Sequence, residues 1–351
     1  MSNESIRPPA VVAVFNHKGG VAKTTTATNI AVCLAARGWR VVLIDLDPQG
    51  NATAGFGHTR LPPVGALDVV AGRCGFAECL LPTPFADLRL LPATEALRMA
   101  ELELAGDETA VQLLRDHLRE GEAIGLADMV VIDCPPSFGM VTLNALYAAT
   151  AVLLPTRPDP YAHDGLLNSW YEIKRLRQEA EADVHVAGIL LTMTEERGPL
   201  ADGAQAIRAE FGQQVYPTHI PGDVAVAEAA QLSLPVVVLD PDGGAGRAYV
   251  AVTAELLARL HGDDGHADDS ATDATLNTLR EWRAEWISQE RIPKQRLGWI
   301  DAEPSASPSA PSAAAAPGRS RSASRLMLGL AFSIGAILGV IVGAAVRGEL
   351  M

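Results

Sequence analysis

A single loop limits the possible folds of this chain more than any other segment. Residues 18–25 read KGGVAKTT, and they stand between an apolar run at residues 11–15 and a helix-like run at residues 26–36. A strand that turns through adjacent glycines into a helix directs several backbone N–H groups and the positive helix end at one point, which suits a polyphosphate. The loop therefore predicts an α/β fold with a phosphate-binding site where the first strand ends.

Lysines and threonines in this loop have side chains that suit a nucleotide and a metal ion. Lys23 is expected to reach the β- and γ-phosphates, and the Thr24 hydroxyl is expected to bind Mg²⁺. Lys18 precedes the glycines, where a standard phosphate loop needs no charge, so we expect it to reach phosphate across a dimer interface. The predicted nucleotide-binding residues are Lys18, Gly19, Gly20, Val21, Ala22, Lys23, Thr24 and Thr25.

The loop departs from the usual pattern G-x-x-x-x-G-K-[ST], which requires glycine at the positions of His17 and Ala22. At Ala22 the added methyl group is tolerated if φ is negative and strained if φ is positive. We expect nucleotide binding to be retained, and the sequence leaves the effect on turnover open.

Apolar runs rich in β-branched residues recur along the chain with helix-like stretches between them. Such runs are typical of strands buried on both faces of a parallel sheet. Their spacing leaves room for crossover helices, so the sequence predicts a doubly wound, mostly parallel sheet. The predicted strands are residues 11–15, 41–46, 88–91, 129–132, 151–154, 186–193, 215–220 and 236–239.

Three aspartates follow the predicted strands where a ligand would bind. Asp45 and Asp47 come at the end of the second apolar run, and Asp133 follows the fourth. Because the carboxyl ends of the strands line the ligand crevice of an open α/β sheet, we predict a metal site formed by Thr24, Asp45 and Asp133. Lys18 and Asp47 are the predicted catalytic residues, with Asp47 orienting or activating the attacking water. Taken alone, Asp45 and Asp47 are better interpreted as residues that end a strand and cap the next helix. Beside the phosphate loop we favour the catalytic interpretation.

Charge and cysteine content restrict the partners and the compartment. The chain carries a net charge of −14, so net charge supplies no broad electrostatic attraction to DNA. Its four cysteines form no C-x-x-C pair, and no signal peptide opens the sequence. These features fit a reducing cytoplasm.

Five segments together resemble the ParA/Soj group of deviant-Walker ATPases, in the superfamily that also contains MinD. They read HKGGVAKTTT, VVLIDLDPQGNAT, VVIDCPPS, GILLTM and IPGDVAVAEAA, and the resemblance covers about residues 10–258. It implies a P-loop NTPase fold that binds ATP and Mg²⁺ and hydrolyses ATP slowly, stimulated by an adaptor protein. It also implies an ATP-dependent homodimer in which Lys18 crosses to the phosphates of the partner, while Asp47 supports hydrolysis.

One departure from the family bears on nucleic acid. Gly222 and Asp223 stand where chromosomal members commonly carry a basic residue after Ile-Pro, which removes an expected DNA contact. Lys174, Arg175 and Arg177 form either a small basic patch or the solvated face of a helix.

The region after residue 260 predicts a tail of a different kind. We place the ATPase domain at residues 1–260 and a flexible linker at residues 261–325, with a short helix near residues 275–290. The apolar stripe of that helix, Leu276, Leu279, Trp282 and Trp286, is expected to dock on the ATPase domain or to receive a partner or a membrane surface.

Residues 326–346 contain no charged side chain and are long enough to span roughly 30 Å of bilayer hydrocarbon. They predict a single transmembrane helix. Arg319, Arg321 and Arg325 precede it, so the positive-inside rule places the ATPase domain in the cytoplasm, at the inner membrane.

The sequence thus predicts a membrane-tethered ParA-like ATPase, a dimer switch that positions or segregates DNA or a protein complex. The alternatives are a conventional plasmid or chromosome partition ATPase that binds nucleoid DNA, and a membrane scaffold that binds ATP without hydrolysing it.

Overall fold

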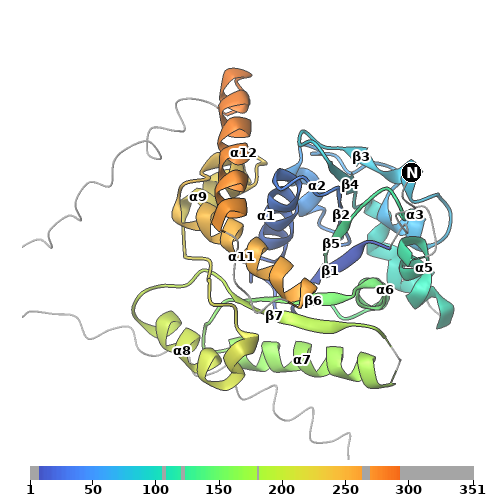
Figure 1. The fold of residues 1–351 in the computed structure, drawn as a ribbon. Helices are drawn as coiled ribbons and strands as arrows, with labels where there is room; N and C mark the ends of the chain where they lie inside the picture. Colours follow the sequence, from blue (N-terminus) through green and yellow to red (C-terminus); the bar gives the residue numbers. More distant parts are fainter. Residues whose placement is uncertain (1–7, 105–107, 120–122, 180–181, 263–268, 293–351) are drawn as a thin grey trace, which may run out of the picture. The chain divides into compact units, whose positions relative to one another are not determined.

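A seven-stranded sheet forms the centre of the computed structural model, which describes residues 8–104, 108–119, 123–179, 182–262 and 269–292 (Figure 1). The strand order is β3-β4-β2-β5-β1-β6-β7. All neighbouring strands are parallel except β3 and β4, so the predicted mostly parallel sheet is confirmed. The strands are β1 (Ala10–Val14), β2 (Val41–Asp45), β3 (Leu81–Pro82), β4 (Leu88–Leu91), β5 (Met129–Asp133), β6 (Ala151–Thr156) and β7 (His185–Leu191).

Helices connect the strands and continue beyond the sheet. The α-helices of the described residues are α1 (Lys23–Ala36), α2 (Asn51–Gly55), α3 (Ala66–Val70), α4 (Ala100–Glu103), α5 (Leu113–Arg119), α6 (Met140–Ala148), α7 (Ala162–Glu179), α8 (Pro199–Phe211), α9 (Val224–Gln231), α10 (Val236–Leu239), α11 (Gly244–His261) and α12 (Asp269–Ser288). The same residues also form the 3₁₀ turns η1 (Ala77–Cys79), η2 (Glu95–Met99), η3 (Glu108–Gln112) and η4 (Gly212–Gln214).

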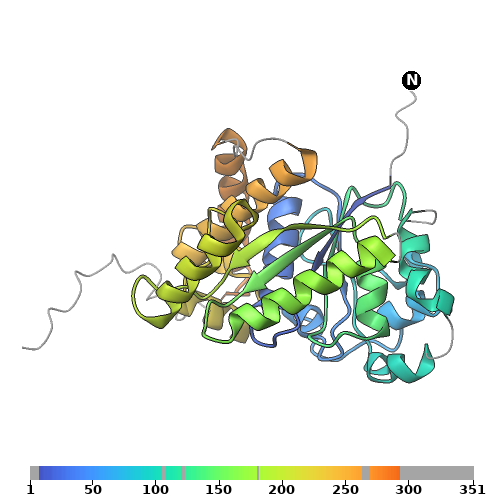
Figure 2. The same ribbon diagram turned by 90° about the horizontal axis from the view of Figure 1, so that it is seen from below.

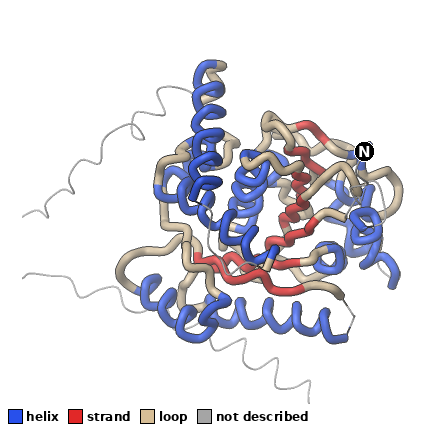
Figure 3. Tube along the Cα trace, viewed as in Figure 1, coloured by secondary structure: helices blue, strands red, loops and turns tan. Residues whose placement is uncertain are grey.

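Helices cover both faces of the sheet (Figures 2 and 3). A hydrophobic layer lies against each face. Successive residues of β1 enter opposite layers, because side chains alternate along a strand. Helices α3, α5, α6 and α7 contribute to one layer, and α1, α10, α11 and α12 contribute to the other. Burial on both faces explains why the strand sequences are almost wholly apolar.

Two predicted strands are wrong. Residues 215–220 form no strand: Val215 makes an isolated bridge to Ile189 of β7, and Pro217 has no N–H to donate to a ladder. Residues 236–239 form helix α10, which begins after Pro235 and packs against α1, with the Val237 N–H bonded to Asn29 Oδ1 at 3.0 Å. A short, fully buried apolar run does not distinguish a strand from a helix by periodicity.

The predicted transmembrane helix also needs correction. In the described part of the chain, no helix is long and apolar enough to cross a bilayer. The longest, α12, has 20 residues, six of which are charged. Residues 326–346 lie outside the described residues. The structure therefore gives no support to a spanning helix, and we withdraw that helix and the inner-membrane location that depended on it.

Helix α12 covers the short helix predicted near residues 275–290, and it belongs to the same compact unit as the sheet, residues 1–303. Residues 263–268 and 293–325 of the predicted linker lie outside the described residues. Cys74 and Cys79 are joined in a disulfide, which the sequence did not predict.

Candidate functional site

The phosphate loop joins β1 to α1 at the edge of the sheet where the parallel strands end (Figure 1). Gly20 has a φ of 72°, and α1 begins at Lys23. No side chain caps this helix, and its first turn contains no acidic residue. The first backbone N–H groups of α1 and its positive dipole end therefore face the loop without a neutralising side chain, as an anion site requires.

Ala22 occupies the left-handed region of backbone space, with φ 64° and ψ 33°. The sequence left the sign of this angle open, and the structure gives the strained alternative. A left-handed conformation costs an L-residue roughly 1–2 kcal/mol because its Cβ approaches the following carbonyl oxygen. The alanine is nevertheless accommodated in the turn, with its carbonyl accepting the Thr26 N–H at 2.8 Å.

Lys23 lies almost fully buried beneath the loop. Its ammonium donates to the Lys18 carbonyl oxygen at 3.0 Å. Burial lowers the pKa of Lys23, while the neighbouring acidic groups, of which Asp133 acts most strongly, oppose that shift. A buried cation beside a helix N-terminus is in position to meet a phosphate, because both then point positive charge at one place.

Asp45 and Asp133 are adjacent in the sheet, at the last register position of β2 and β5. Both are fully buried. Oxygen Oδ2 of Asp45 accepts two hydrogen bonds at 2.7 Å, from the backbone N–H and the hydroxyl of Thr53. Neither carboxylate oxygen of Asp133 has a hydrogen-bond partner of good geometry among the described residues.

Burial is the main cause that raises the pKa of both aspartates. It raises the pKa of Asp45 to about 6. For Asp133, the nearby charge of Asp45 raises the pKa further, while the Thr24 hydroxyl and Lys23 oppose the increase. Two carboxyl groups are therefore held close together in a water-poor site, an arrangement that a bound cation would stabilise.

The remaining predicted residues line the same edge. Asp47 is half-buried, and its Oδ1 accepts the Gln49 N–H at 2.9 Å. Gly19 and Gly20 are exposed, Thr24 and Thr25 are half-buried, and Val21 is buried, with its carbonyl bonded by the Thr192 hydroxyl at 3.2 Å.

Lys18 turns toward its own chain in this structure. Its ammonium forms an ion pair with both carboxylate oxygens of Asp159, in the loop that follows β6. Its backbone N–H donates to Asn16 Oδ1 at 3.0 Å, and Asn16 in turn donates to the Pro155 carbonyl at 2.9 Å. Lys18 is therefore held in place by contacts with the end of β6 and the loop that follows it.

His17 links the phosphate loop to the loop after β5. Its ring lies against Phe15 and Phe138, with centroid distances of 5.2 Å and 5.3 Å, and its N–H bonds to the Ser169 hydroxyl. The position where the usual pattern has glycine therefore carries a packed aromatic ring.

The sequence reasoning missed Asp159 and Thr53. Asp159 lies 141 residues from Lys18 and follows a strand end, which was the only signal available in the sequence. Thr53 lies within GNAT, close after Asp45 and Asp47, but nothing in its spacing indicated two hydrogen bonds to a carboxylate.

The donor set fits Mg²⁺ better than a transition metal. Within the described residues, no group of three or more His, Cys, Asp or Glu side chains could hold an ion alone. Mg²⁺ is usually held by one or two carboxylates together with waters and substrate phosphates, so Asp45, Asp133 and the Thr24 hydroxyl are sufficient. The buried oxygens of Asp133, which have no hydrogen-bond partner of good geometry among the described residues, are the observation that supports this fit.

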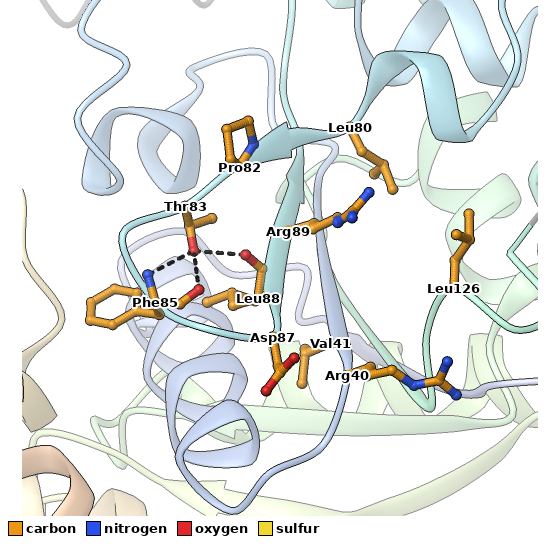
Figure 4. Close-up of a pocket in the computed structure, with 10 residues that line it drawn as sticks. All are labelled: Arg40, Val41, Leu80, Pro82, Thr83, Phe85, Asp87, Leu88, Arg89 and Leu126. Atoms are coloured by element: carbon orange, nitrogen blue, oxygen red, sulfur yellow. Dashed lines mark hydrogen bonds between the residues drawn. The ribbon is translucent and has the colours of Figure 1, made fainter.

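The cavities among the described residues of this domain include one at each end of the parallel strands. A cavity of about 320 Å³ adjoins the phosphate loop and is lined by Thr24, Thr25 and residues of α2 and α9. A larger one, of about 490 Å³, lies where β2 and β4 begin (Figure 4). It is lined by Arg40, Asp87 and Arg89 among others, and its location excludes it as the phosphate site.

Comparison with known proteins gives the family. A family model described as an AAA domain matches residues 9–186, just over half of the chain. The chromosome partitioning protein ParA of Caulobacter vibrioides is 38% identical over 257 residues, which cover 73% of this chain and 96% of that protein. The chain belongs to the ParA/Soj family. The chromosome-partitioning ATPase Soj of Thermus thermophilus, also in this family, is 39% identical over 250 residues, covering 71% of this chain and 96% of that protein.

A solved structure carries ligands of the kind predicted for this ParA/Soj chain. Cobyrinic acid a,c-diamide synthase from Mycobacterium smegmatis, with bound ATP analog and magnesium, is 31% identical. The two folds superpose with a TM-score of 0.63, over 74% of this chain and 98% of that chain. The family resemblance found in the sequence is therefore confirmed, and ATP and Mg²⁺ are the ligands against which the site is interpreted.

Proposed function

We propose that this ParA/Soj chain is a Mg²⁺-dependent ATP hydrolase that works as an ATP-dependent dimer switch in the partitioning of DNA or a protein complex. The observation that carries the proposal is the buried Asp133 carboxylate, which lacks a well-aligned partner among the described residues and lies near Lys23 and Asp45. Such a group is costly to keep unless an ion binds there. The partitioning proteins ParA and Soj, to which the chain is similar, support the same role.

Each residue of the site has a definite part in this reaction. Lys23 and the N–H groups of the loop would hold the phosphates, and the Thr24 hydroxyl, Asp45 and Asp133 would hold Mg²⁺. The metal, when bound, neutralises charge on the phosphates, which is the main requirement of phosphoryl transfer. Asp47, at the mouth of the site, orients the attacking water.

The ion pair between Lys18 and Asp159 supports a switch. In the single chain, Asp159 neutralises the Lys18 ammonium. When two ATP-bound chains meet, Lys18 leaves Asp159 for the phosphates of the partner, so that nucleotide and dimer become linked. We expect Lys18→Ala to retain ATP binding and to lose ATP-dependent dimers, as measured by size-exclusion chromatography with ATP and Mg²⁺. Dimer formation equal to that of the wild type would exclude this role for Lys18.

Whether the cargo is DNA or a protein complex is expected to depend on the charge of the surface near α7 and α9. Asp223 caps α9 and also accepts the Ala245 N–H at 3.2 Å, so an acidic side chain fills the place of the expected basic one. On α7, Arg175 pairs with Glu172, and Lys174 lies over the Trp170 ring. Salt-dependent retention on nonspecific DNA that requires ATP would indicate a DNA cargo, and no retention at low salt would indicate a protein cargo.

Nucleotide binding and turnover of the full chain test the proposal directly. With Mg²⁺ present, the wild type is expected to bind ATP and release ADP and phosphate slowly, and faster with an adaptor protein. Lys23→Met is expected to weaken ATP binding at least about tenfold, because it removes a charged hydrogen-bond donor. Lys174→Met, which removes an exposed lysine on α7, serves as the matched control. A wild-type protein without affinity for ATP and Mg²⁺ would refute the proposal.

A further inference from the structure

Helix α12 lies beyond residues 10–258, the part that resembles the ParA/Soj family, yet it packs firmly on the ATPase domain. It contacts α1, α10 and α11 (Figure 1). Leu276, Leu279 and Trp286 are buried in the same hydrophobic layer as α1. The apolar stripe of this helix is therefore used inside the domain.

Polar contacts fix the position of α12 along this surface. The Arg280 guanidinium bonds to both carboxylate oxygens of Asp242, at 3.0 Å and 2.6 Å. The Arg283 Nε donates to the Leu239 carbonyl at 2.9 Å. Both partners belong to α10 or to the loop between α10 and α11, so the helix has one register on the domain.

A row of aromatic rings extends from α12 toward α2. Trp286 stacks on Phe85, with a centroid distance of 5.2 Å and an interplanar angle of 14°. Trp282 approaches the same ring at 5.1 Å. Phe85 in turn meets the edge of Phe56 at 5.9 Å, and Phe56 directly follows α2. Aromatic pairs at these distances are attractive beyond their buried area.

Phe85 is held rigidly between these neighbours. The Thr83 hydroxyl donates to the Leu88 carbonyl at 2.8 Å and accepts the Phe85 N–H at 3.2 Å, which closes the loop between β3 and β4 (Figure 4). Phe85 is itself buried. Phe85 therefore packs between the tryptophans of α12 and Phe56, within a densely packed layer.

The other end of this row reaches the candidate metal site. Helix α2 has only five residues and no side-chain cap, so tertiary contacts must hold it in place. Within it, the Thr53 hydroxyl and N–H fix Asp45 Oδ2, and the same hydroxyl accepts the Ala93 N–H at 2.9 Å. Phe56 and Thr53 thus connect the aromatic row to a carboxylate of the metal site.

We propose that α12 is a built-in regulator of the nucleotide site, which acts through Trp286, Phe85, Phe56 and Thr53 on the position of Asp45. Docked α12 holds α2 and the carboxylate in the arrangement that binds Mg²⁺, and release of α12 weakens Mg²⁺-dependent nucleotide binding. Because binding linkage is reciprocal, Mg²⁺ with ADP also strengthens the docking of α12. This inference rests on the nucleotide binding in the proposed function, but not on hydrolysis, dimerisation or cargo.

Affinity for ADP, measured on the full chain with Mg²⁺ and with EDTA, tests the linkage. Phe85→Leu and Trp286→Leu are expected to weaken binding with Mg²⁺ about fivefold and to change binding in EDTA less than twofold. Phe211→Leu is the matched control, because Phe211 also packs on a tryptophan, Trp170, in the opposite layer. It is expected to leave both affinities unchanged.

Hydrogen exchange of the wild type provides a second measurement that needs no variant. Exchange of α12 amides is expected to slow about fivefold when ADP and Mg²⁺ are added, and to change little with ADP in EDTA. Unchanged exchange in α12, together with normal affinity in Phe85→Leu, would overturn the regulator while leaving the proposed function intact. A wild type that binds no nucleotide would instead refute both.

Discussion

The two edges of the sheet hold charged residues in opposite ways. At the edge where the strands begin, Arg40 and Asp128 are partly exposed and joined by hydrogen bonds from Nε and from the backbone, each 3.0 Å long. At the edge where the strands end, Asp45 and Asp133 are fully buried, and Asp133 lacks a hydrogen-bond partner of good geometry within the described residues.

This difference separates structural charges from those held for a ligand. An exposed, paired arginine and aspartate lose little on folding and also contribute little to stability. Buried carboxyl groups without enough partners lower stability and persist only where they serve another purpose. Cavity size alone would have pointed to the wrong edge, because the larger cavity lies beside Arg40.

Loss of turnover is the largest expected effect. Asp47→Asn is expected to reduce ATP hydrolysis at least about 100-fold, because the carboxylate that orients the attacking water is removed. Its ATP affinity should stay close to that of the wild type. Asp87→Asn, at the opposite edge, is the control and should hydrolyse ATP normally. Equal loss in both variants would remove the functional distinction between the edges.

The pH dependence of stability should differ in sign between the edges. Burial raises the pKa of Asp45 to about 6, above the value of about 3.9 in an unfolded chain. Between these values the folded state binds more protons, so this residue lowers the free energy of unfolding as pH rises, by at most about 3 kcal/mol. A hydrogen bond from Arg40 lowers the pKa of Asp128, which therefore stabilises the fold as pH rises.

Urea unfolding of the ligand-free protein at pH 3, 4.5 and 7.5 checks these signs. Relative to the wild type, Asp45→Asn should gain stability between pH 4.5 and 7.5. Asp128→Asn should lose stability between pH 3 and 4.5, because a lowered pKa acts only below the unfolded value of about 3.9. Shifts of the same sign in both variants would contradict the comparison.

Removal of the buried charge itself should stabilise the empty protein. Asp133→Asn is expected to raise the free energy of unfolding by about 2 kcal/mol at pH 7.5 without Mg²⁺, while Mg²⁺-dependent ATP binding is lost. Asp128→Asn is expected to cost less than about 1 kcal/mol. Thermal unfolding with and without MgATP measures both, and a destabilised Asp133→Asn would show that the carboxylate is structural.

The ion pair between Lys18 and Asp159 is expected to break when two ATP-bound chains form a dimer. Asp159→Asn frees Lys18 and should strengthen ATP-dependent dimers about threefold to fivefold, within the range for a partly exposed pair. Analytical ultracentrifugation with ATP and Mg²⁺ gives the dimer affinity. Asp128→Asn, which breaks the pair at the other edge, should leave dimer formation unaltered, and an equal gain there would refute the role of Asp159.

The smallest effect concerns backbone strain. Both edges contain a residue with positive φ, Ala22 at 64° and Asp87 at 60°. Ala22→Gly is expected to raise the free energy of unfolding by about 0.5–1 kcal/mol, because alanine is strained in this region. Asp87→Gly should stay within about 0.5 kcal/mol of the wild type, since aspartate tolerates the left-handed conformation. The denaturant midpoints of the two variants measure this difference in stability. A lower stability of Ala22→Gly than of the wild type would show that the backbone at Ala22 is not strained.

Much of the fold was predictable because its signals are local. Six of the predicted strands are strands, since long buried apolar runs separated by helical stretches leave few alternatives. The two errors, at residues 215–220 and 236–239, are short runs beside prolines, where tertiary packing decides between strand, helix and coil. The transmembrane helix was inferred from composition alone and finds no support in the described residues.

The phosphate loop, the parallel sheet and the placement of Asp45 and Asp133 at strand ends could be predicted from the order of the residues alone. These follow from periodicity, glycine turns and chain direction, which act over a few residues. Only the tertiary structure decided the sign of φ at Ala22, the pairing of Lys18 with Asp159 and the docking of α12 on Phe85. Each of these depends on contacts between distant parts of the chain, whose geometry is set by how the whole core packs.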